Sequence, residues 1–323
     1  MNEMNRRHQS NRLSGQIRRS MNIKLRATKI NCTTFFARNF GPVPYFDVDL
    51  QKTVDLRSYL QTDSRKPGVS VFMRLRNEEQ FVETTVESII DHVDELVMVH
   101  NGCTDRTPEI IESCRLRYPD RIRIFEYKPA VFVPGSIEHS QEPMGSPHSL
   151  VNYYNYALAK TTRKIAIKID GDELYLDKPF KQLTDDVRSG KRSTPIGIFG
   201  INLWDENGEI LVNARHPVLS GLDKGFFTVS PRTFFVHYRH YELFTCAFKR
   251  SAGIIFYHLK GMKKNRGIGN YCIQPGATTF SAAKVAGLTS PGLASWQEFS
   301  LQMGDSENLP HPASLGLRAR QSP

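Results

Sequence analysis

Long apolar runs are missing from this sequence of 323 residues. No stretch reaches the roughly 18 consecutive apolar residues that a transmembrane helix needs, so no membrane span is expected. The N-terminal segment is basic, but no apolar segment follows its charges, so it lacks the pattern of a secretory signal. Both absences favour a cytoplasmic protein.

Cysteine is also scarce, with five residues in the chain. Their number is odd and their spacing matches no zinc-binding pattern, so we expect a reducing compartment. Most of them are expected to serve as small apolar core residues. The five are Cys32, Cys103, Cys114, Cys246 and Cys272.

Acidic residues are nearly absent from the first 29 residues, which hold eight Lys and Arg side chains and only Glu3. The whole chain has a formal net charge of +10, and we expect residues 1–66 to form a basic, partly disordered extension. A second interpretation is peripheral contact with anionic lipid at the inner face of a membrane. No aromatic residue precedes Phe35, so nucleic-acid binding is not expected. Translation from Met21 instead of Met1 would remove most of this charge.

The first half of the chain alternates strand and helix patterns. Predicted strands span residues 69–75, 95–99 and 121–127, the last with the alternation of an edge strand. Apolar residues at helical spacing predict a helix within 77–93, and Thr107 followed by Pro108 predicts the start of another. Strands separated by helical connections favour a mostly parallel α/β sheet.

An acidic cluster follows the next predicted strand. After a Pro- and Gly-containing loop over 129–148 and a helix, the run 164–169 predicts a fourth strand. Asp170 and Asp172, an Asp-x-Asp motif, stand directly beyond it, where ligands of open parallel sheets bind. Two such carboxylates can hold one Mg²⁺ or Mn²⁺ together with a diphosphate. A solvated acidic turn is the alternative, which the position after a buried strand disfavours.

Several segments, taken in order, resemble family-2 inverting glycosyltransferases with a GT-A fold. They are VSVFMRLRNEE (69–79), ELVMVHNGCTDRTPEII (95–111) and NYYNYALAKTTRKIAIKIDGDE (152–173). The resemblance covers residues 69–176. It implies an α/β, Rossmann-like sheet with flanking helices, a small antiparallel hairpin near the acceptor site, and a nucleotide-sugar donor.

The resemblance also implies roles for single residues. Asp170 and Asp172 would bind the metal, with Asp170 also contacting the donor. Four more residues would contact the nucleoside or shape its pocket: Asn77, Glu78, Asn101 and Asp105. Asp105 is equally suited to cap the helix that follows it.

Two further positions leave alternatives open. Asn155 would brace the acidic cluster or lie at the surface. His100 stands where the family usually places an acid that pairs with uracil, and a neutral imidazole is not a fixed acceptor. Uridine, guanosine and cytidine donors therefore all remain open.

The second half of the chain must supply the acceptor side. The run 194–204, the Asn207–Gly208 turn and the run that follows it predict a β-hairpin. Inverting transfer needs a carboxylate that takes the acceptor proton, and the candidates are Asp205, Glu206, Asp223 and Glu242. We favour Glu242, then Asp223, because the aromatic and histidine neighbours of Glu242 favour a raised pKa.

The segment 256–267 combines a histidine with basic residues. His258 would complete the metal site, and the basic residues would hold the diphosphate or an anionic acceptor; these are Lys260, Lys263, Lys264 and Arg266. A partly buried histidine and a solvated basic face are the alternatives. His237 and His240 are weaker candidates for acceptor contact.

Together these features predict a metal-dependent, inverting glycosyltransferase that acts on a glycan or glycolipid, for example in surface polysaccharide or lipopolysaccharide synthesis. The predicted domain spans 67–272, with a nucleotide-binding half over 67–176 and an acceptor half over 177–272. A polar tail, with one amphipathic helix, follows over 273–323. A sugar-phosphate nucleotidyltransferase and a degenerate nucleotide-binding module are the alternatives. The first lacks its glycine-rich segment here, and the intact Asp170–Asp172 pair disfavours the second.

Overall fold

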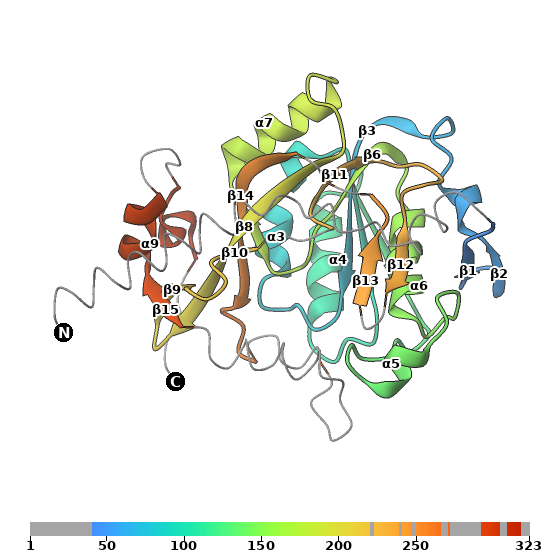
Figure 1. The fold of residues 1–323 in the computed structure, drawn as a ribbon, viewed down its shortest axis with the longest axis horizontal. Helices are drawn as coiled ribbons and strands as arrows, with labels where there is room; N and C mark the ends of the chain where they lie inside the picture. The colour runs from blue at the N-terminus through green and yellow to red at the C-terminus, as the bar shows by residue number, and fades with distance from the viewer. Residues whose placement is uncertain are drawn as a thin grey trace.

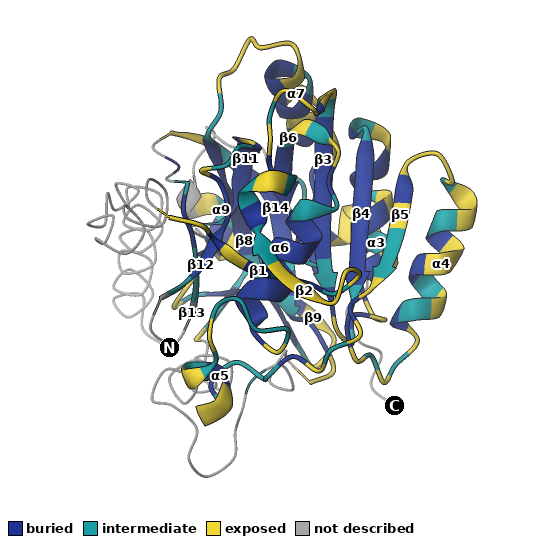
Figure 2. Ribbon diagram, turned by 90° about the vertical axis from the view of Figure 1, so that its right-hand side faces the viewer, coloured by how far each residue is buried: buried dark blue, intermediate teal, exposed yellow. Residues whose placement is uncertain are grey.

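The computed structural model describes residues 41–219, 223–238, 241–246, 248, 250–265, 271, 292–303 and 309–317. Within these residues, 11 strands form one large sheet, and helices cover both of its faces (Figures 1 and 2). None of the described helices has the length and hydropathy of a membrane span. The predictions about the basic residues 1–29, His240, Arg266, Cys32 and Cys272 lie outside the described residues.

The four strands predicted from apolar runs lie side by side and parallel. Across the sheet they are β6 (Arg163–Lys168), β3 (Lys66–Leu75), β4 (Glu95–His100) and β5 (Ile122–Glu126). β5 lies at the edge, as its alternating pattern predicted. The connecting helices include α3 (Val82–Glu87), α4 (Thr107–Arg117) and α6 (Leu150–Ala159). α3 is shorter than predicted, because a 3-10 turn, η2 (Ile90–His92), follows it.

Side chains alternate between two cores across β3. Val71 and Met73 belong to the core under α3, α4 and α7 (Asp177–Arg188), whereas Phe72 belongs to the core under α6. α6 is buried on nearly every side because β1 (Pro44–Asp47) and the core under its other face cover it. The Asn152 amide on α6 bonds both the N–H and the C=O of Phe46 on β1.

The second half of the chain extends the sheet and positions the site. β8 (Ile196–Glu206) and β9 (Glu209–Asn213) form the predicted hairpin, and Asn207 and Gly208 both have positive φ, as a type I′ turn requires. β11 (Gly225–Thr228) lies antiparallel between β8 and β6. β14 (Ser251–Gly261) pairs with β7 (Glu173–Tyr175) and with β8, so His258 stands opposite both Glu173 and Asn202.

The remaining elements lie around this sheet. They are β2 (Lys52–Asp55), η1 (Leu56–Tyr59), α5 (Ile137–Gln141), β10 (Val218–Leu219), the hairpin of β12 (Phe235–Tyr238) and β13 (Tyr241–Phe244), β15 (Leu293–Ser295), α9 (Trp296–Met303) and η4 (Pro312–Leu315).

Two expectations from the sequence were wrong. Residues 44–59 are not irregular, because β1, β2 and η1 occupy most of them and anchor on α6. The predicted amphipathic helix near the C-terminus starts only at Trp296, because Leu293–Ser295 form β15 and pair with β9.

Candidate functional site

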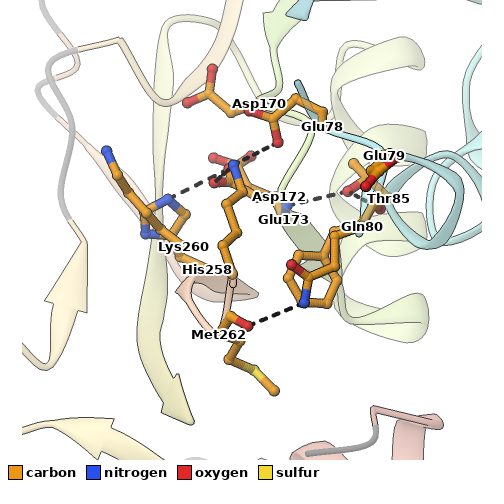
Figure 3. A network of polar contacts seen from close by, with 12 residues as sticks. Glu78, Glu79, Gln80, Thr85, Asp170, Asp172, Glu173, His258, Lys260 and Met262 are labelled. Atoms are coloured by element: carbon orange, nitrogen blue, oxygen red, sulfur yellow. Dashed lines mark hydrogen bonds and ion pairs between the residues drawn. The ribbon is translucent and has the colours of Figure 1, made fainter. Parts of the chain in front are cut away.

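The Asp170–Gly171–Asp172 turn lies beyond the carboxyl end of β6 and packs against the end of β3. A Cβ at Gly171 would lie 2.8 Å from the Leu75 side chain and 3.0 Å from Cγ of Glu78. Glycine is therefore what allows both carboxylates to approach the turn that follows β3. Figure 3 shows these acids converging with His258 of β14.

Asp172 shares a lysine with Glu78. The Lys263 ammonium, just after β14, lies 2.7 Å from Asp172 Oδ2 and 2.6 Å from Glu78 Oε2. The Gln80 amide fixes the same segment, since it donates to the Met262 carbonyl (3.2 Å) and accepts from the Lys264 N–H (3.0 Å) (Figure 3). In this arrangement Lys263 balances two buried acids.

Asp170 lies between two buried lysines. Lys168 Nζ is 3.0 Å from Asp170 Oδ1 and 2.6 Å from Asp223 Oδ2. Lys224 Nζ is 2.6 Å from Asp170 Oδ2 and also pairs with Glu173. Burial alone would raise the pKa of Asp170, but the two ammonium groups outweigh it and hold that pKa well below its usual range. Sequence analysis did not assign Lys168, although a lysine within an apolar strand was a visible signal.

His258 faces Asp172 with a defined ring nitrogen. The Asn202 amide donates to the His216 carbonyl (2.6 Å), so its oxygen is the acceptor 2.7 Å from His258 Nδ1. This network assigns the proton to Nδ1 and leaves the lone pair of Nε2 directed at Asp172 Oδ1, 3.6 Å away. Burial lowers the pKa of His258 to about 4, which keeps the ring neutral. Sequence analysis missed Asn202, whose role depends on the pairing of β8 with β14.

A divalent cation fits between Asp172 Oδ1 and His258 Nε2. Two acceptor atoms facing each other at this separation have no proton to share, and a second-shell acceptor on Nδ1 is the usual support of a metal-binding histidine. The cluster around these atoms contains three lysines and five acids: Glu78, Asp170, Asp172, Glu173 and Asp223. Burial raises the pKa of Glu78 to about 8 and that of Glu173 to about 7, whereas the pKa values of the three aspartates are lowered.

The protein supplies few ligands for such an ion. Among the described residues, no group of three or more His, Cys, Asp or Glu side chains is arranged to hold a metal. Two protein ligands completed by diphosphate oxygens and water are typical of Mg²⁺ sites. Both oxygens of Asp170 already contact ammonium groups, so the ligands that fit are Asp172 and His258.

The residues predicted to contact the nucleoside bind other parts of the protein. Asn77, with φ of 56°, accepts from the Thr104 N–H, and Asn101 donates to two backbone carbonyls. Asp105 accepts from the N–H groups of Thr107 (3.0 Å) and Glu79 (3.0 Å). Asp105 therefore accepts from the N–H of the first residue of α4, whose N-cap position is Arg106. These side chains hold together the two loops at the strand ends.

Asn155 neither braces the acidic cluster nor lies at the surface, so both interpretations were wrong. Its buried amide accepts from the N–H of Phe235 (2.9 Å) and donates to the C=O of the same residue (3.0 Å). It therefore fastens the β12–β13 hairpin to α6. Phe235 also stacks on Tyr154 of the same helix, with ring centroids 4.5 Å apart.

The two favoured base candidates have different surroundings. Glu242 on β13 is 12% exposed, and its Oε1 has no hydrogen-bond partner among the described residues. Burial raises the pKa of Glu242, in the direction the sequence predicted. For Asp223, burial acts in the same direction, but Lys168 and Lys224 outweigh it and lower its pKa. Asp205 and Glu206 end β8 beside the hairpin turn.

Arg74 lies between the Asp170 cluster and Glu242. Its guanidinium carbon lies 3.3 Å from the centroid of the Tyr154 ring, so the guanidinium makes a cation–π interaction with that ring. Its charge acts on both Asp170 and Glu242. Its buried Nε has no hydrogen-bond partner in the described part of the chain. Sequence analysis gave Arg74 no role, because it lies within the first predicted strand.

Residues 41–186 match the family described as "Beta-1,4-N-acetylgalactosaminyltransferase (CgtA)". No curated protein sequence matches the chain.

Solved structures with weak similarity include S. aureus TarS 1–349 in complex with UDP, at 19% identity, covering 42% of this chain and 36% of that one, with a TM-score of 0.30. Another is glucosyl-3-phosphoglycerate synthase from Mycobacterium tuberculosis with Mn²⁺, UDP and phosphoglyceric acid, at 19% identity, 46% of each chain and a TM-score of 0.27. A longer S. aureus TarS structure aligns at 13% identity over 74% of this chain and 44% of its own, with a TM-score of 0.37.

This chain therefore spans less than half the length of each solved protein, and similarity at this level carries no argument about activity. The family match carries the comparison. Over residues 41–186 the chain is similar to a glycosyltransferase family, in agreement with the predicted class of enzyme. The observed sheet with helices on both faces agrees with the predicted α/β architecture.

Proposed function

We propose that this protein transfers a sugar from a nucleotide-sugar donor to a hydroxyl of a glycan or glycolipid, with inversion and with Mn²⁺ or Mg²⁺. The observation that carries the proposal is the pair of facing acceptor atoms, Asp172 Oδ1 and His258 Nε2, beyond the carboxyl end of the parallel sheet. A bound divalent ion would neutralise charge on the departing diphosphate. The description of the matching family supports an N-acetylgalactosamine donor as the first to test.

Fixed charges around Asp170 prepare the donor side. Lys168 and Lys224 hold the Asp170 carboxylate from two directions, so the turn keeps its position when a charged ligand enters. Such preorganisation lowers the reorganisation that the reaction itself would otherwise require. Lys263 does the same for Asp172 and Glu78, which joins the end of β14 to the turn after β3.

Glu242 is the base that we assign. A general base works best when its pKa lies near the working pH, and burial moves the pKa of Glu242 upward, whereas Asp223 is paired with Lys168 at 2.6 Å. In the transfer, the acceptor O–H gives its proton to a Glu242 oxygen. The acceptor oxygen forms the new bond to the anomeric carbon as the bond from that carbon to the diphosphate oxygen breaks.

Three wider features complete the proposal. Synthesis of surface polysaccharide or lipopolysaccharide is the process, supported by the similarity to a family that glycosylates with an amino sugar. A cytoplasmic location with peripheral contact to anionic lipid rests on the basic residues 1–29. A transferase domain over 67–272 extends at its N-terminal side to residue 41, because the family match begins there.

A thermal-shift panel tests the donor chemistry. Nucleoside diphosphates are added to the full chain with and without Mn²⁺, and mass spectrometry then follows sugar transfer from a panel of nucleotide sugars. Stabilisation by a diphosphate only when Mn²⁺ is present supports the transferase. Stabilisation independent of metal, without transfer, identifies a degenerate module. Preference for a nucleoside triphosphate with a sugar phosphate identifies a nucleotidyltransferase.

A further inference from the structure

A cluster of two histidines and one carboxylate lies away from the acidic turn, where β12 and β13 meet α5. His237 on β12 is directly opposite Glu242 on β13 in the antiparallel register, so both side chains project from the same face of the hairpin. His139 on α5 approaches from the other side, with its Nε2 3.5 Å from Glu242 Oε1. The two imidazole rings are 5.8 Å apart at 44°.

Packing alone does not account for this cluster. His139 is 4% exposed, and Glu242 Oε1 and His237 Nε2 are buried without a hydrogen-bond partner among the described residues. An unsatisfied buried polar atom costs about 1–3 kcal/mol, so these two atoms, Glu242 Oε1 and His237 Nε2, are an expensive way to fill a core. The Ser136 side chain accepts from the backbone N–H of His139 and caps the start of α5.

We propose that His139 and His237 are positioning residues for Glu242, and that His139 receives the proton which Glu242 takes from the acceptor. This inference rests on the proposed role of Glu242 as the base. After transfer, the proton moves from a Glu242 carboxyl oxygen to Nε2 of His139, so the carboxylate is regenerated and the imidazole becomes imidazolium. The imidazolium then loses the proton to water, and no other reactant is needed.

The chemistry of the groups suits this order of steps. A buried carboxyl with a raised pKa holds its proton at pH values where an ordinary glutamate would release it. An imidazole, with an unperturbed pKa near 6.5, is the side chain best matched to accept that proton near neutral pH. His237 is the cross-strand partner of Glu242, and its charge, when it is protonated, favours the Glu242 carboxylate.

Several charged or titratable groups in the described residues act on Glu242 from the elements around it. They are Arg74 on β3, Tyr154 on α6, Asp223 before β11, His139 on α5 and His237 on β12. Arg74 favours the carboxylate and Asp223 opposes it. Both remain in place when a histidine is replaced, so a change in the pH profile of a histidine variant reports on the imidazole.

The experiment compares His139→Ala, His139→Gln, His237→Gln and Glu242→Gln with the unmodified full chain. Donor transfer is measured from pH 5 to 9, with and without added imidazole. For His139→Ala we expect kcat to fall by about tenfold to a hundredfold, as for other outer partners of active-site groups, with an unchanged donor KM. The acid limb of kcat loses the contribution of His139, because only the neutral imidazole can receive the proton, and added imidazole restores part of kcat.

The outcomes separate this proposal from the one it rests on. Full turnover in Glu242→Gln removes the base assignment itself. If Glu242→Gln is inactive while both His139 variants keep a normal kcat and pH profile, the base assignment stands and the relay is overturned. The relay is also overturned if His139→Ala loses kcat and added imidazole restores none of it. Thermal stabilisation by a nucleoside diphosphate with Mn²⁺ confirms folding, and His139→Gln serves if the alanine variant does not fold.

Discussion

The proposed donor side, around Asp170 and Asp172, and the proposed acceptor side, around Glu242, differ in how their charges are compensated. On the donor side, Asp170 and Asp172 each have an ammonium group within 2.7 Å. On the acceptor side, Glu242 Oε1 and His237 Nε2 are buried and have no hydrogen-bond partner in the described part of the chain. Arg74 stands between the two sides and acts on both Asp170 and Glu242.

This difference matches two kinds of chemistry. The lysines beside Asp170 and Asp172 outweigh burial and lower the pKa values of these two carboxylates, which therefore stay ionised and suit binding of a cation and a diphosphate. A buried carboxyl without a cation partner at hydrogen-bond distance has a raised pKa, which suits exchange of a proton. Carboxylate side chains therefore serve two different purposes on the two sides, according to the neighbours that the fold places beside them.

Replacing Asp172 should have the largest effect. Asp172→Asn removes the anionic oxygen that faces His258 Nε2 and the charge that pairs with Lys263. We expect transfer to fall below detection and the Mn²⁺-dependent thermal shift with a nucleoside diphosphate to disappear. Asp63→Asn, at an exposed position, is the matched control. Near-normal turnover of Asp172→Asn would show that the metal assignment is wrong.

Replacing the proposed base, Glu242, should have the second largest effect. Glu242→Gln should lower kcat by about 10²–10⁴-fold, the usual contribution of general base catalysis, while donor binding is kept. Asp223→Asn should lower kcat less, because Asp223 pairs with Lys168 and does not accept the proton. Steady-state kinetics of both variants measure the two losses of kcat. A larger loss in Asp223→Asn than in Glu242→Gln would identify Asp223 as the base.

The pH dependence of the unmodified enzyme tests the same comparison without a mutation. The base must be ionised, so kcat falls as the pH drops through the pKa of the base. Because burial raises the pKa of Glu242, this fall should begin at a higher pH than for an ordinary glutamate, whose pKa is about 4.3. If Asp223 were the base, its lowered pKa would preserve kcat to more acidic pH.

A smaller effect is expected at Asn202, which supports the metal site from outside. Asn202→Leu removes the acceptor for His258 Nδ1, so the ring no longer has a fixed tautomer, and Mn²⁺ affinity should fall by about 10–100-fold. Asn202→Asp keeps that acceptor and should retain more of the affinity. Metal titration followed by thermal shift measures both, and equal losses would mean that the histidine tautomer is unimportant.

Local patterns in the sequence were enough to predict much of the proposed donor side. Apolar runs predicted β3, β4 and β6, and the position of Asp170 and Asp172 after a strand predicted where the acids lie. The sequence could not predict that Lys224 and Lys263 pair with the acids. These lysines reach the acids only because β11 pairs with β6 and β14 pairs with β7.

The proposed acceptor side was harder to predict, because its contacts also join residues that are far apart in the sequence. Glu242 was selected from its neighbours in sequence, but His139 lies in a segment that looked like plain loop, and its contact with Glu242 joins residues about a hundred positions apart. Long-range contacts of this kind depend on strand order and register, which periodicity does not encode. Arg74 was missed because its strand is otherwise apolar.

The smallest predicted effect serves as a reference for the others. Gly208 has φ of 84° in the β8–β9 turn, and an L-residue there is strained. Gly208→Ala should lower the free energy of unfolding by about 1–2 kcal/mol, measured by denaturant titration, with kcat and its pH profile unchanged. If this variant lost activity as Asn202→Leu does, loss of stability would explain both, and the comparison between paired and unpaired charges would lose its support. If kcat is kept, the effects at Asp172, Glu242 and Asn202 reflect their local charges.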